Sequence, residues 1–370
     1  MLKVVWRRYA DISYNKLVVN LSQKLKTKPS DLTKVPFGTV FTDHMIEVDW
    51  CEDKGWGSPE IKPYQKIPLD PSSSVFHYCT ECYEGFKVYS NPPHILSFRP
   101  MTNMERFVVS AEAAGLPKCD SYELLKCIDE LIRIDKDWVP QLPGYTLYVR
   151  PNMFGTHAQL SVTKPKKAKI CVIMSLVGPY FPSGYKPISL YCDETMIRTW
   201  PGGHGHKKLG GNYAPVINPA EKVRKLGYDN ILWLCQGHVT EVGVMNFFAL
   251  FKNHHGLELV TSPIHQMVLP GVTRDSIIQL IHEWGDIKMS ERDFTINELI
   301  EHLENGTVVE AFGSGTAAVI CPINKLAYKG KEYNIPTTLG NCGELTKKIF
   351  DELTMIQYGK IKHKWNHYIA

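Results

Sequence analysis

The chain contains 370 residues, of which 44% are hydrophobic, and its 42 basic and 38 acidic side chains leave a net charge of only +4. This length favours two domains. The mild charge and the lack of a long basic run argue against nucleic acid as a partner, and no apolar stretch approaches the ~20 residues that cross a membrane. Ten cysteines in so long a chain favour a reducing compartment over a disulfide framework.

The first ten residues differ in character from the rest of the chain. Basic and apolar side chains are interspersed there, and no acidic residue precedes Asp11. This pattern favours a mitochondrial targeting segment, or its remnant, over a frayed basic tail. We therefore predict an N-terminal extension over residues 1–36, which ends in a polar, proline-containing linker. The predicted location is mitochondrial, with a cytoplasmic one as the alternative.

The next part of the chain alternates strand and helix patterns. Residues 37–41 and 44–48 predict two short strands with a turn between them. Thr102 and Glu105 have the spacing of a capping box at the start of a helix, and Ser121 is the expected N-cap of the following helix. Further strands are predicted at residues 145–150 and 170–177.

Glycine and proline residues gather between positions 178 and 187 and mark the best domain boundary. Beyond it, a helix pattern follows residue 271 and stops at Gly285, and Thr295 with Glu298 predicts a second capping box. The strands predicted in this half are residues 188–192, 231–235, 246–251, 258–261 and 308–312. We therefore predict a mixed α/β protein with a small domain over residues 37–177, a linker over 178–187 and a larger domain over 188–370.

The glycine-rich segment 200–213 surrounds Lys207 and Lys208 and predicts a tight loop around something bulky, because glycine permits positive φ and close backbone approach. It is not a P-loop, since no glycine directly precedes the lysine pair and no Ser or Thr follows it. It is not a dinucleotide fingerprint either, since Lys208 stands at the third glycine position. Two interpretations remain about even: an exposed turn with incidental lysines, and a partly desolvated nucleophilic lysine that forms a Schiff base.

Two other turns are candidates for holding an anion. Residues 271–273 at a helix start and residues 313–316 after a strand would offer backbone N–H groups to a phosphate, although ordinary capping and a tight turn explain each equally well. Glu241 lies at the mouth of an apolar strand, where an acid is more often a surface turn residue. Together, an amine, a carboxylate and two anion-binding turns are what pyridoxal phosphate requires.

From about residue 37 to residue 358 the chain resembles the branched-chain amino-acid aminotransferases of the animal type, a class IV family of pyridoxal-phosphate enzymes. The motifs that carry the resemblance are residues 37–45, 83–85, 98–100, 177–181, 208–213, 240–243, 269–274 and 312–316. The resemblance implies the two-domain fold of D-amino-acid aminotransferases, a homodimer, small-molecule substrates and no metal. It implies transfer of the amino group of leucine, isoleucine or valine to 2-oxoglutarate, giving the branched 2-oxo acid and glutamate by a ping-pong mechanism.

The same resemblance implies roles for individual residues. Lys208, rather than Lys207, is the lysine that binds the cofactor covalently, because it directly precedes Leu-Gly-Gly-Asn-Tyr. Tyr213 would hydrogen-bond the phenolic oxygen of the cofactor, and Glu241 its pyridine nitrogen. The cofactor phosphate is expected at Arg106, Val272, Thr273 and Thr316. The substrate is expected at Phe37, Tyr83, Tyr148, Arg150, Tyr180, Thr316 and Ala317, and at a Tyr78 contributed by the neighbouring subunit.

The sequence departs from the family's pattern in three places. Val244 stands where animal members often have Thr, the loop residues His204, His206 and Lys207 are unusual, and Ala318 replaces the first cysteine of a C-x-x-C that ends at Cys321. Cys79 and Cys82 form another C-x-x-C, which we interpret as packing thiols. Two rival functions are a D-amino-acid aminotransferase or aminodeoxychorismate lyase of the same fold, and a catalytically silent binding protein.

Overall fold

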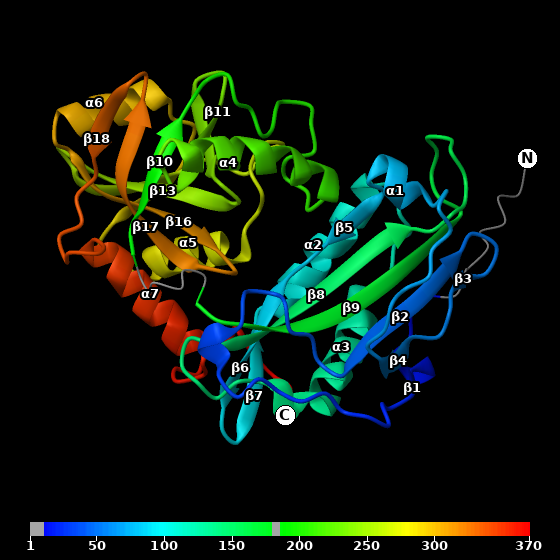
Figure 1. The fold of residues 1–370 in the computed structure, drawn as a ribbon. Helices are drawn as coiled ribbons and strands as arrows, with labels where there is room; N and C mark the ends of the chain where they lie inside the picture. The colour runs from blue at the N-terminus through cyan, green and yellow to red at the C-terminus, as the bar shows by residue number, and fades with distance from the viewer. Residues whose placement is uncertain (1–10, 180–185) are drawn as a thin grey trace, which may run out of the picture. The chain divides into compact units, whose positions relative to one another are not determined.

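The computed structural model describes residues 11–179 and 186–370. The targeting prediction for the first ten residues and the substrate contact predicted for Tyr180 lie outside the described residues. The chain forms two compact units (Figure 1). The first contains the described residues up to Gly178, together with Lys208–Gly210 and Lys364–Ala370; the second contains the described remainder.

The first unit is built on a mixed sheet whose strands follow the order β1-β4-β2-β9-β8-β6-β7-β19, with β3 paired to β2 and β5 paired to β8. The long strands β8 and β9 form its centre and pair antiparallel over their full length. The strands are β1 (Val18–Val19), β2 (His44–Cys51), β3 (Gly55–Trp56), β4 (Glu60–Pro63), β5 (Glu81–Tyr83), β6 (Phe86–Asn91), β7 (His94–Phe98), β8 (Thr146–Gly155), β9 (Lys167–Val177) and β19 (Asn366–Tyr368).

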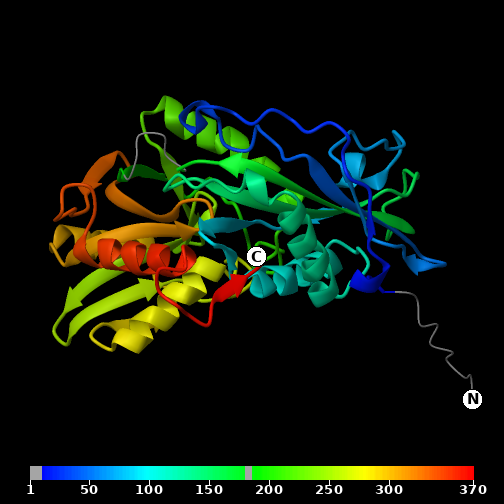
Figure 2. The ribbon, with the colours of Figure 1, turned by 90° about the horizontal axis from the view of Figure 1, so that it is seen from below.

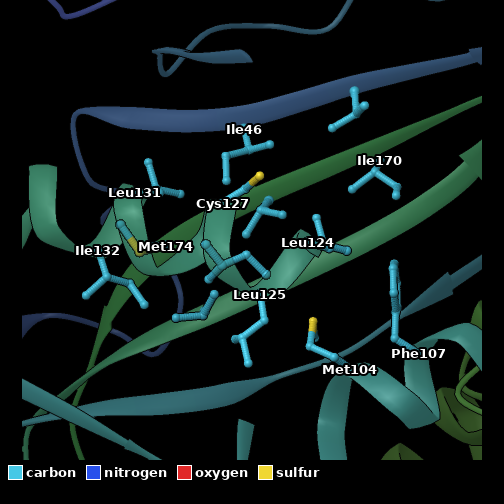
Figure 3. Packing of buried hydrophobic residues seen from close by; sticks show 14 of the residues in the cluster. Ile46, Met104, Phe107, Leu124, Leu125, Cys127, Leu131, Ile132, Ile170 and Met174 are labelled. Carbon is cyan, nitrogen blue, oxygen red and sulfur yellow. The ribbon is translucent and has the colours of Figure 1, made fainter. Parts of the chain in front are cut away.

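Helices α2 (Pro100–Ala113) and α3 (Ser121–Ile134) cover one face of this sheet, and the short helix α1 (Ser74–Tyr78) precedes β5. Figure 3 shows Met104 and Phe107 of α2 and Leu124 and Leu131 of α3 packed toward the strands. Each fully buried side chain of this size stabilises the fold by about 1.5–3 kcal/mol. Because these helices cover one face of the sheet, strand side chains that point to the opposite face are available to form a binding site.

The second unit contains a sheet that closes on itself. Its strands follow the order β12-β11-β10-β17-β16-β13-β14-β15, and β12 also pairs with β13. The apolar side chains inside this closed sheet form the second core. The strands are β10 (Ile188–Cys192), β11 (Asn230–Cys235), β12 (His238–Val242), β13 (Met245–Asn253), β14 (Gly256–Thr261), β15 (Lys288–Glu291), β16 (Val308–Gly315), β17 (Val319–Tyr328) and β18 (Lys331–Asn334).

The helices of the second unit are α4 (Ile217–Lys225), α5 (Val272–Trp284), α6 (Ile296–Glu304) and α7 (Glu344–Gln357). Helices α5 and α7 both contact β16, and they lie next to one another in both views (Figures 1 and 2). Among the described helices, none combines the length and the apolar character that crossing a membrane requires.

Several local predictions are confirmed in the second unit. Gly285 is the left-handed C-cap of α5, with φ 73°. The Thr295 side chain accepts a hydrogen bond from the Glu298 amide (3.1 Å) and caps α6, as the capping-box spacing predicted. The predicted strands correspond to β10, β11, β13, β14 and β16.

Three local predictions are wrong in the first unit. Residues 37–41 form no strand apart from one isolated bridge, Phe41 to Ser175. Thr102 does not cap α2, because the helix already begins at Pro100, a residue whose fixed φ suits the first helical turn. Ser121 is the first residue of α3 rather than its cap, since the Asp120 side chain accepts hydrogen bonds from the amides of Tyr122 and Glu123.

The end of the chain also departs from the predicted division. We predicted that residues 188–370 form one domain, but Lys208–Gly210 belong to the first unit, and so does the C-terminal segment Lys364–Ala370. The reason is backbone pairing: β19 lies antiparallel to β7, with His367 opposite Ser97. Such pairing between segments far apart in sequence leaves no local signal.

A buried carboxylate from β16 caps α7. Glu310 is 2% exposed and accepts hydrogen bonds from the amides of Leu345 (2.9 Å) and Thr346 (2.8 Å) and from the Thr346 hydroxyl. A negative charge at a helix N-terminus is favourable because the first N–H groups have no partner within the helix. Glu310 therefore joins the sheet to a helix more than thirty residues later in the chain.

Replacement of Glu310 by Ala is expected to destabilise the protein by about 2–3 kcal/mol, since hydrogen bonds to a buried charged group are worth more than neutral ones. Thr295→Ala is the matched control, because it removes the neutral cap of α6 and should cost about 1 kcal/mol. Thermal and urea unfolding of both variants provide the measurement. An equal decrease in the free energy of unfolding in the two variants would contradict the larger contribution that we assign to Glu310.

Candidate active site

Lys208 is held through its backbone in the first unit. Its carbonyl accepts a hydrogen bond from the Tyr83 amide (3.1 Å), and its own N–H donates to Ser110 Oγ (3.0 Å). The next residue, Leu209, forms a bridge to Cys82 of β5. The Lys208 amine lies 4.7 Å from the centre of the Tyr83 ring. This anchoring favours a positioned nucleophile over an incidental lysine in an exposed turn.

An aromatic group surrounds Arg150 on the face of the sheet that α2 and α3 leave uncovered. The Arg150 guanidinium carbon lies 4.9 Å from the Tyr83 ring centre and 5.3 Å from that of Tyr148, and Phe37 meets Tyr148 edge to face at 5.7 Å. Side chains alternate along β8, so Val149 enters the core while Tyr148 and Arg150 face the other way. The structure thus brings together Phe37, Tyr83, Tyr148 and Arg150, and their contact with a substrate stays a prediction.

Gly85 provides the space that Tyr148 occupies. A Cβ atom at position 85 would overlap the hydroxyl oxygen and the ring edge of Tyr148. Gly85→Ala is therefore expected to displace Tyr148 and to lower kcat/KM for leucine by about tenfold or more, because a misplaced pocket residue disturbs substrate orientation. Steady-state kinetics measure this loss.

Gly57→Ala is the matched control for this variant. A Cβ atom at position 57 would meet the Asp49 carbonyl oxygen at 3.4 Å, an ordinary contact, and Gly57 lies outside the aromatic group. It should leave kcat/KM unchanged. An unchanged kcat/KM in Gly85→Ala would show that the position of Tyr148 does not matter for the reaction.

Arg106 and Glu84 form a buried bidentate pair. Arg106 Nε and Nη2 donate to the two Glu84 carboxylate oxygens at 2.5 and 2.9 Å, and the Asn103 amide adds a further hydrogen bond to Glu84 (3.0 Å). Burial raises the pKa of the Glu84 carboxyl, but Arg106 and, to a lesser extent, Lys208 offset this and hold the pKa below its ordinary value. The sequence analysis missed Glu84 as an orienting partner of Arg106, whose phosphate contact stays a prediction.

Lys87 is a second lysine beside the aromatic group. It lies directly opposite Tyr148 in the pairing of β6 with β8, and it is 8% exposed. Burial lowers the pKa of its amine to about 8. The signal that could have identified it is a lysine between two apolar strand residues, Phe86 and Val88.

In the second unit, Glu241 lies on β12 opposite Asn246 of β13. Its Oε1 accepts hydrogen bonds from the Asn246 amide (3.1 Å) and from the backbone N–H of Leu269 (3.2 Å), and Arg198 Nη1 lies 2.7 Å from its Oε2. Glu241 is 2% exposed, so its interpretation as a surface turn residue is wrong. Arg198 was missed, because a single arginine before the glycine-rich segment gives no pattern.

The other residues predicted for the cofactor also lie in the second unit. Tyr213 places its ring 5.5 Å from the Arg198 guanidinium carbon. Val272 and Thr273 form the first turn of α5, which has no side-chain cap, and Thr316 and Ala317 lie in the turn between β16 and β17. The structure therefore groups Tyr213 with Glu241 through Arg198, and it places Val272 and Thr273 at a helix N-terminus.

The remaining departures from the family pattern are visible in the second unit. Val244 is 45% exposed, and the rings of His204 and His206 stack at 6.4 Å. Burial lowers the pKa of His206 below its ordinary value. The glycine-rich segment is joined to Gln266, because the Gly202 amide donates to its side chain and the His206 amide donates to its carbonyl. These contacts give the segment a defined backbone.

Mild peroxide is expected to leave activity largely unchanged, and a thiol reductant should not raise it. Cys321 is fully buried, and burial raises the pKa of its thiol to about 12, which suppresses the reactive thiolate. Cys79 is exposed, but Cys82 is buried in the core, where burial raises the pKa of its thiol well above the ordinary value. An activity assay over a peroxide series, with disulfide mapping by mass spectrometry, provides the measurement.

Cys79→Ser serves as the control for that experiment, since it removes the exposed Cys79 thiol and leaves the buried thiols of Cys82 and Cys321 unchanged. A reversible loss that tracks a Cys79–Cys82 disulfide would show redox control at that pair. Oxidation at Cys321 would show that burial does not protect it.

Comparison with known proteins gives the family. A sequence model of the amino-transferase class IV family matches residues 81–326. The mitochondrial branched-chain-amino-acid aminotransferase of Bos taurus is 42% identical over 366 residues, which cover 97% of this chain and 93% of the relative. The cytosolic branched-chain-amino-acid aminotransferase of Mus musculus is 44% identical over 355 residues, which cover 94% and 91%.

A solved structure supports the fold. The branched-chain aminotransferase of Thermoproteus uzoniensis, solved with norvaline, superposes with a TM-score of 0.70 at 24% identity and covers 88% of this chain and 100% of its own. At that identity the likeness shows the fold alone, and it confirms the predicted mixed α/β, class IV architecture. The sequence relatives carry the argument further: the chain belongs to the branched-chain-amino-acid aminotransferase family of the class IV aminotransferases.

Proposed function

We propose that this chain is a pyridoxal-phosphate-dependent aminotransferase that moves the amino group of leucine, isoleucine or valine to 2-oxoglutarate. The observation that carries the proposal is the anchored amine of Lys208 above Tyr83, next to an arginine enclosed by aromatic rings. A cofactor that is bound covalently through its carbonyl carbon needs a lysine amine in a fixed place, and here the hydrogen-bonded backbone of Lys208 provides that placement. The relatives supply the substrate class, since they are named for branched-chain amino acids.

The side chains present fit pyridoxal phosphate. The first turn of α5 has no side-chain cap, and a Cβ atom at Gly271 would overlap the Asn246 side chain, so the backbone there suits an anion. Ser314, just before the Thr316 turn, has a buried hydroxyl with no hydrogen-bond partner among the described residues. Glu241 offers a buried acceptor to a ring nitrogen. When bound, the cofactor would supply an electron sink for the bond changes at the substrate Cα.

The chain's own residues would divide the remaining work. Lys208 would hold the cofactor and would carry the proton at the substrate Cα, a general acid–base role worth about 10²–10⁴-fold. Glu241 and Tyr213 would orient the ring through its nitrogen and its phenolic oxygen. Arg106, Val272, Thr273 and Thr316 would bind the phosphate.

The aromatic group would select the substrate. Leucine has three more carbons than alanine, and about 0.8 kcal/mol per buried carbon gives roughly 2.4 kcal/mol, or about fiftyfold preference. Phe37, Tyr83 and Tyr148 provide the apolar surface, while Arg150 Nε is buried without a hydrogen-bond partner among the described residues. An unsatisfied guanidinium donor of this kind suits a carboxylate.

We also propose a homodimer. Phe76, Tyr78, Leu160 and Val162 are 60%, 36%, 67% and 80% exposed, and the Tyr78 hydroxyl donates to the Leu160 carbonyl, which joins the two segments that carry these apolar side chains. An apolar group of this kind suits contact with a second copy of the chain. The Tyr78 of one subunit would then serve the pocket of its partner. Sedimentation of the purified protein tests the dimer.

A mitochondrial location is part of the proposal, and it rests on the basic, acid-free first ten residues. The relatives named above include one mitochondrial and one cytosolic protein, so similarity alone leaves the compartment undecided. Imaging of the tagged chain, with and without residues 1–10, tests the proposal. Identical cytosolic staining of both forms would contradict it.

The absorption spectrum of the purified protein, before and after addition of leucine and then of 2-oxoglutarate, tests the function. We expect a cofactor band that leucine shifts and 2-oxoglutarate restores. A band that amino acids leave unchanged would support a silent binding protein. A shift with D-alanine and none with leucine would support a D-amino-acid aminotransferase.

A further inference from the structure

Arg198 is a buried cation to which the family resemblance assigned no role. It lies between β10 and the glycine-rich segment, and its side chain is 1% exposed. Its Nη1 lies 2.7 Å from Glu241 Oε2, and its guanidinium carbon lies 5.5 Å from the Tyr213 ring centre. Arg198 is thus in contact with both residues that are proposed to orient the cofactor ring.

The environment of Glu241 explains why a cation is needed there. A carboxylate that is 2% exposed has lost its hydration, and desolvation favours the neutral, protonated form. Two N–H donors, from Asn246 and Leu269, are directed at Oε1. The Arg198 guanidinium lies against the other oxygen, Oε2. An opposite charge within about 4 Å favours the ionised form.

The contact with Tyr213 adds a geometric effect. A guanidinium above an aromatic face is attracted to it, and the planar group stacks with little freedom. Neither Arg198 Nε nor Nη1 has a hydrogen-bond partner among the described residues, so Arg198 meets Glu241 as an ion pair at 2.7 Å and Tyr213 through the face of its ring. Arg198 therefore links the Glu241 carboxylate to the Tyr213 ring.

We propose that Arg198 is a positioning residue for the cofactor ring. It keeps the Glu241 carboxylate ionised, so that this group accepts a hydrogen bond from a protonated pyridine nitrogen, and it fixes the distance from that carboxylate to the Tyr213 hydroxyl. The inference rests on the proposed function, which brings the cofactor to Glu241 and Tyr213. The alternative is that the ion pair only joins β12 to the segment before the glycine-rich loop and contributes to stability.

A double-mutant cycle separates the two interpretations. The variants are Arg198→Gln, Glu241→Gln, the double variant and Arg198→Lys. Arg292→Gln is the matched control, because Arg292 pairs with Glu298 (2.6 Å) in the same unit and has no place in the site. Each apo-protein is titrated with pyridoxal phosphate by absorbance, the leucine half-reaction is followed in single turnover, and the melting temperature of the apo-protein is recorded.

If the proposal is correct, Arg198→Gln weakens cofactor binding and slows the half-reaction by about tenfold, within the range of coupling between contacting residues. In the Glu241→Gln background the same change has an effect below about twofold, because no carboxylate remains to be held. Arg198→Lys, which keeps the charge, recovers most of both losses. Arg292→Gln matches the wild type in cofactor affinity and half-reaction rate.

Two results would overturn the proposal. One is that Arg198→Gln lowers cofactor affinity and half-reaction rate equally in the wild-type and the Glu241→Gln backgrounds. This result would mean that Arg198 acts independently of the carboxylate. The other is a lower melting temperature with unchanged cofactor affinity and half-reaction rate. Failure of the proposed function is recognised separately, because the wild type would then show no spectral response to leucine. If Arg198→Gln does not fold, Arg198→Lys and the double variant still decide the question.

Discussion

Lys208→Ala is expected to abolish transamination, whereas Lys207→Ala is expected to keep most of it. The two residues are adjacent, and they differ in how the chain holds them. Lys208 is bound to β5 and α2 through its own carbonyl and amide, and its amine lies over Tyr83. The Lys207 carbonyl instead accepts a hydrogen bond from the Asn212 side chain within the glycine-rich segment. The loss in Lys208→Ala should exceed the 10²–10⁴-fold that general acid–base catalysis alone contributes, because the covalent attachment is lost as well.

Borohydride reduction of the holoenzyme, followed by peptide mapping, provides the direct measurement. We expect a pyridoxyl label on Lys208, and no label on the same peptide of Lys208→Ala. Lys207→Ala is the matched control, since it removes a neighbouring amine from the same segment. A label on Lys207 in the wild type would refute the assignment.

Glu241→Gln is expected to leave the cofactor bound and to slow transamination by more than tenfold, which is 1.4 kcal/mol in the barrier. The cofactor should remain because the phosphate-binding turns and Lys208 are unchanged. The rate should fall because a neutral amide no longer favours a protonated ring nitrogen, and the ring then accepts electrons less well. Glu241 is well suited to this role, since its Oε1 is fixed by Asn246 and Leu269.

Single-turnover absorbance with leucine measures the effect in that variant. Glu298→Gln is the control, because it removes the charge of a carboxylate that pairs with Arg292 elsewhere in the same unit. A loss smaller than tenfold in Glu241→Gln would indicate that the carboxylate is structural.

The sequence predicts those features that depend on neighbours along the chain. Thr295 and Glu298 form a capping box because the two residues meet within one helical turn. The same reasoning failed at Thr102, where Pro100 starts the helix two residues earlier. Local sequence rules therefore predict that a helix forms in this region. They do not fix its first residue when two possible starts lie a few residues apart.

The features that escaped prediction join segments far apart in the chain. Glu310 caps a helix that starts 34 residues later, and Arg198 meets Glu241 across a similar separation. Glu84 and Arg106 are closer in sequence, but their pairing depends on how α2 packs against the strands. Among the residues of the proposed site, the family resemblance supplied those that we propose to contact the cofactor or substrate. It did not supply the charged partners that hold them.

The return of the C-terminus to the first unit has a consequence for synthesis of the protein. Ile95 donates to the Ala370 carbonyl (2.8 Å), and Arg133 Nε donates to the Ile369 carbonyl (2.9 Å). Translation runs from the N-terminus, so β7 is made long before β19, and its edge stays open until β19 has been made and pairs with it. An unpaired strand edge invites pairing with other chains. The nascent chain is therefore open to strand pairing with other chains for as long as β19 has not been made.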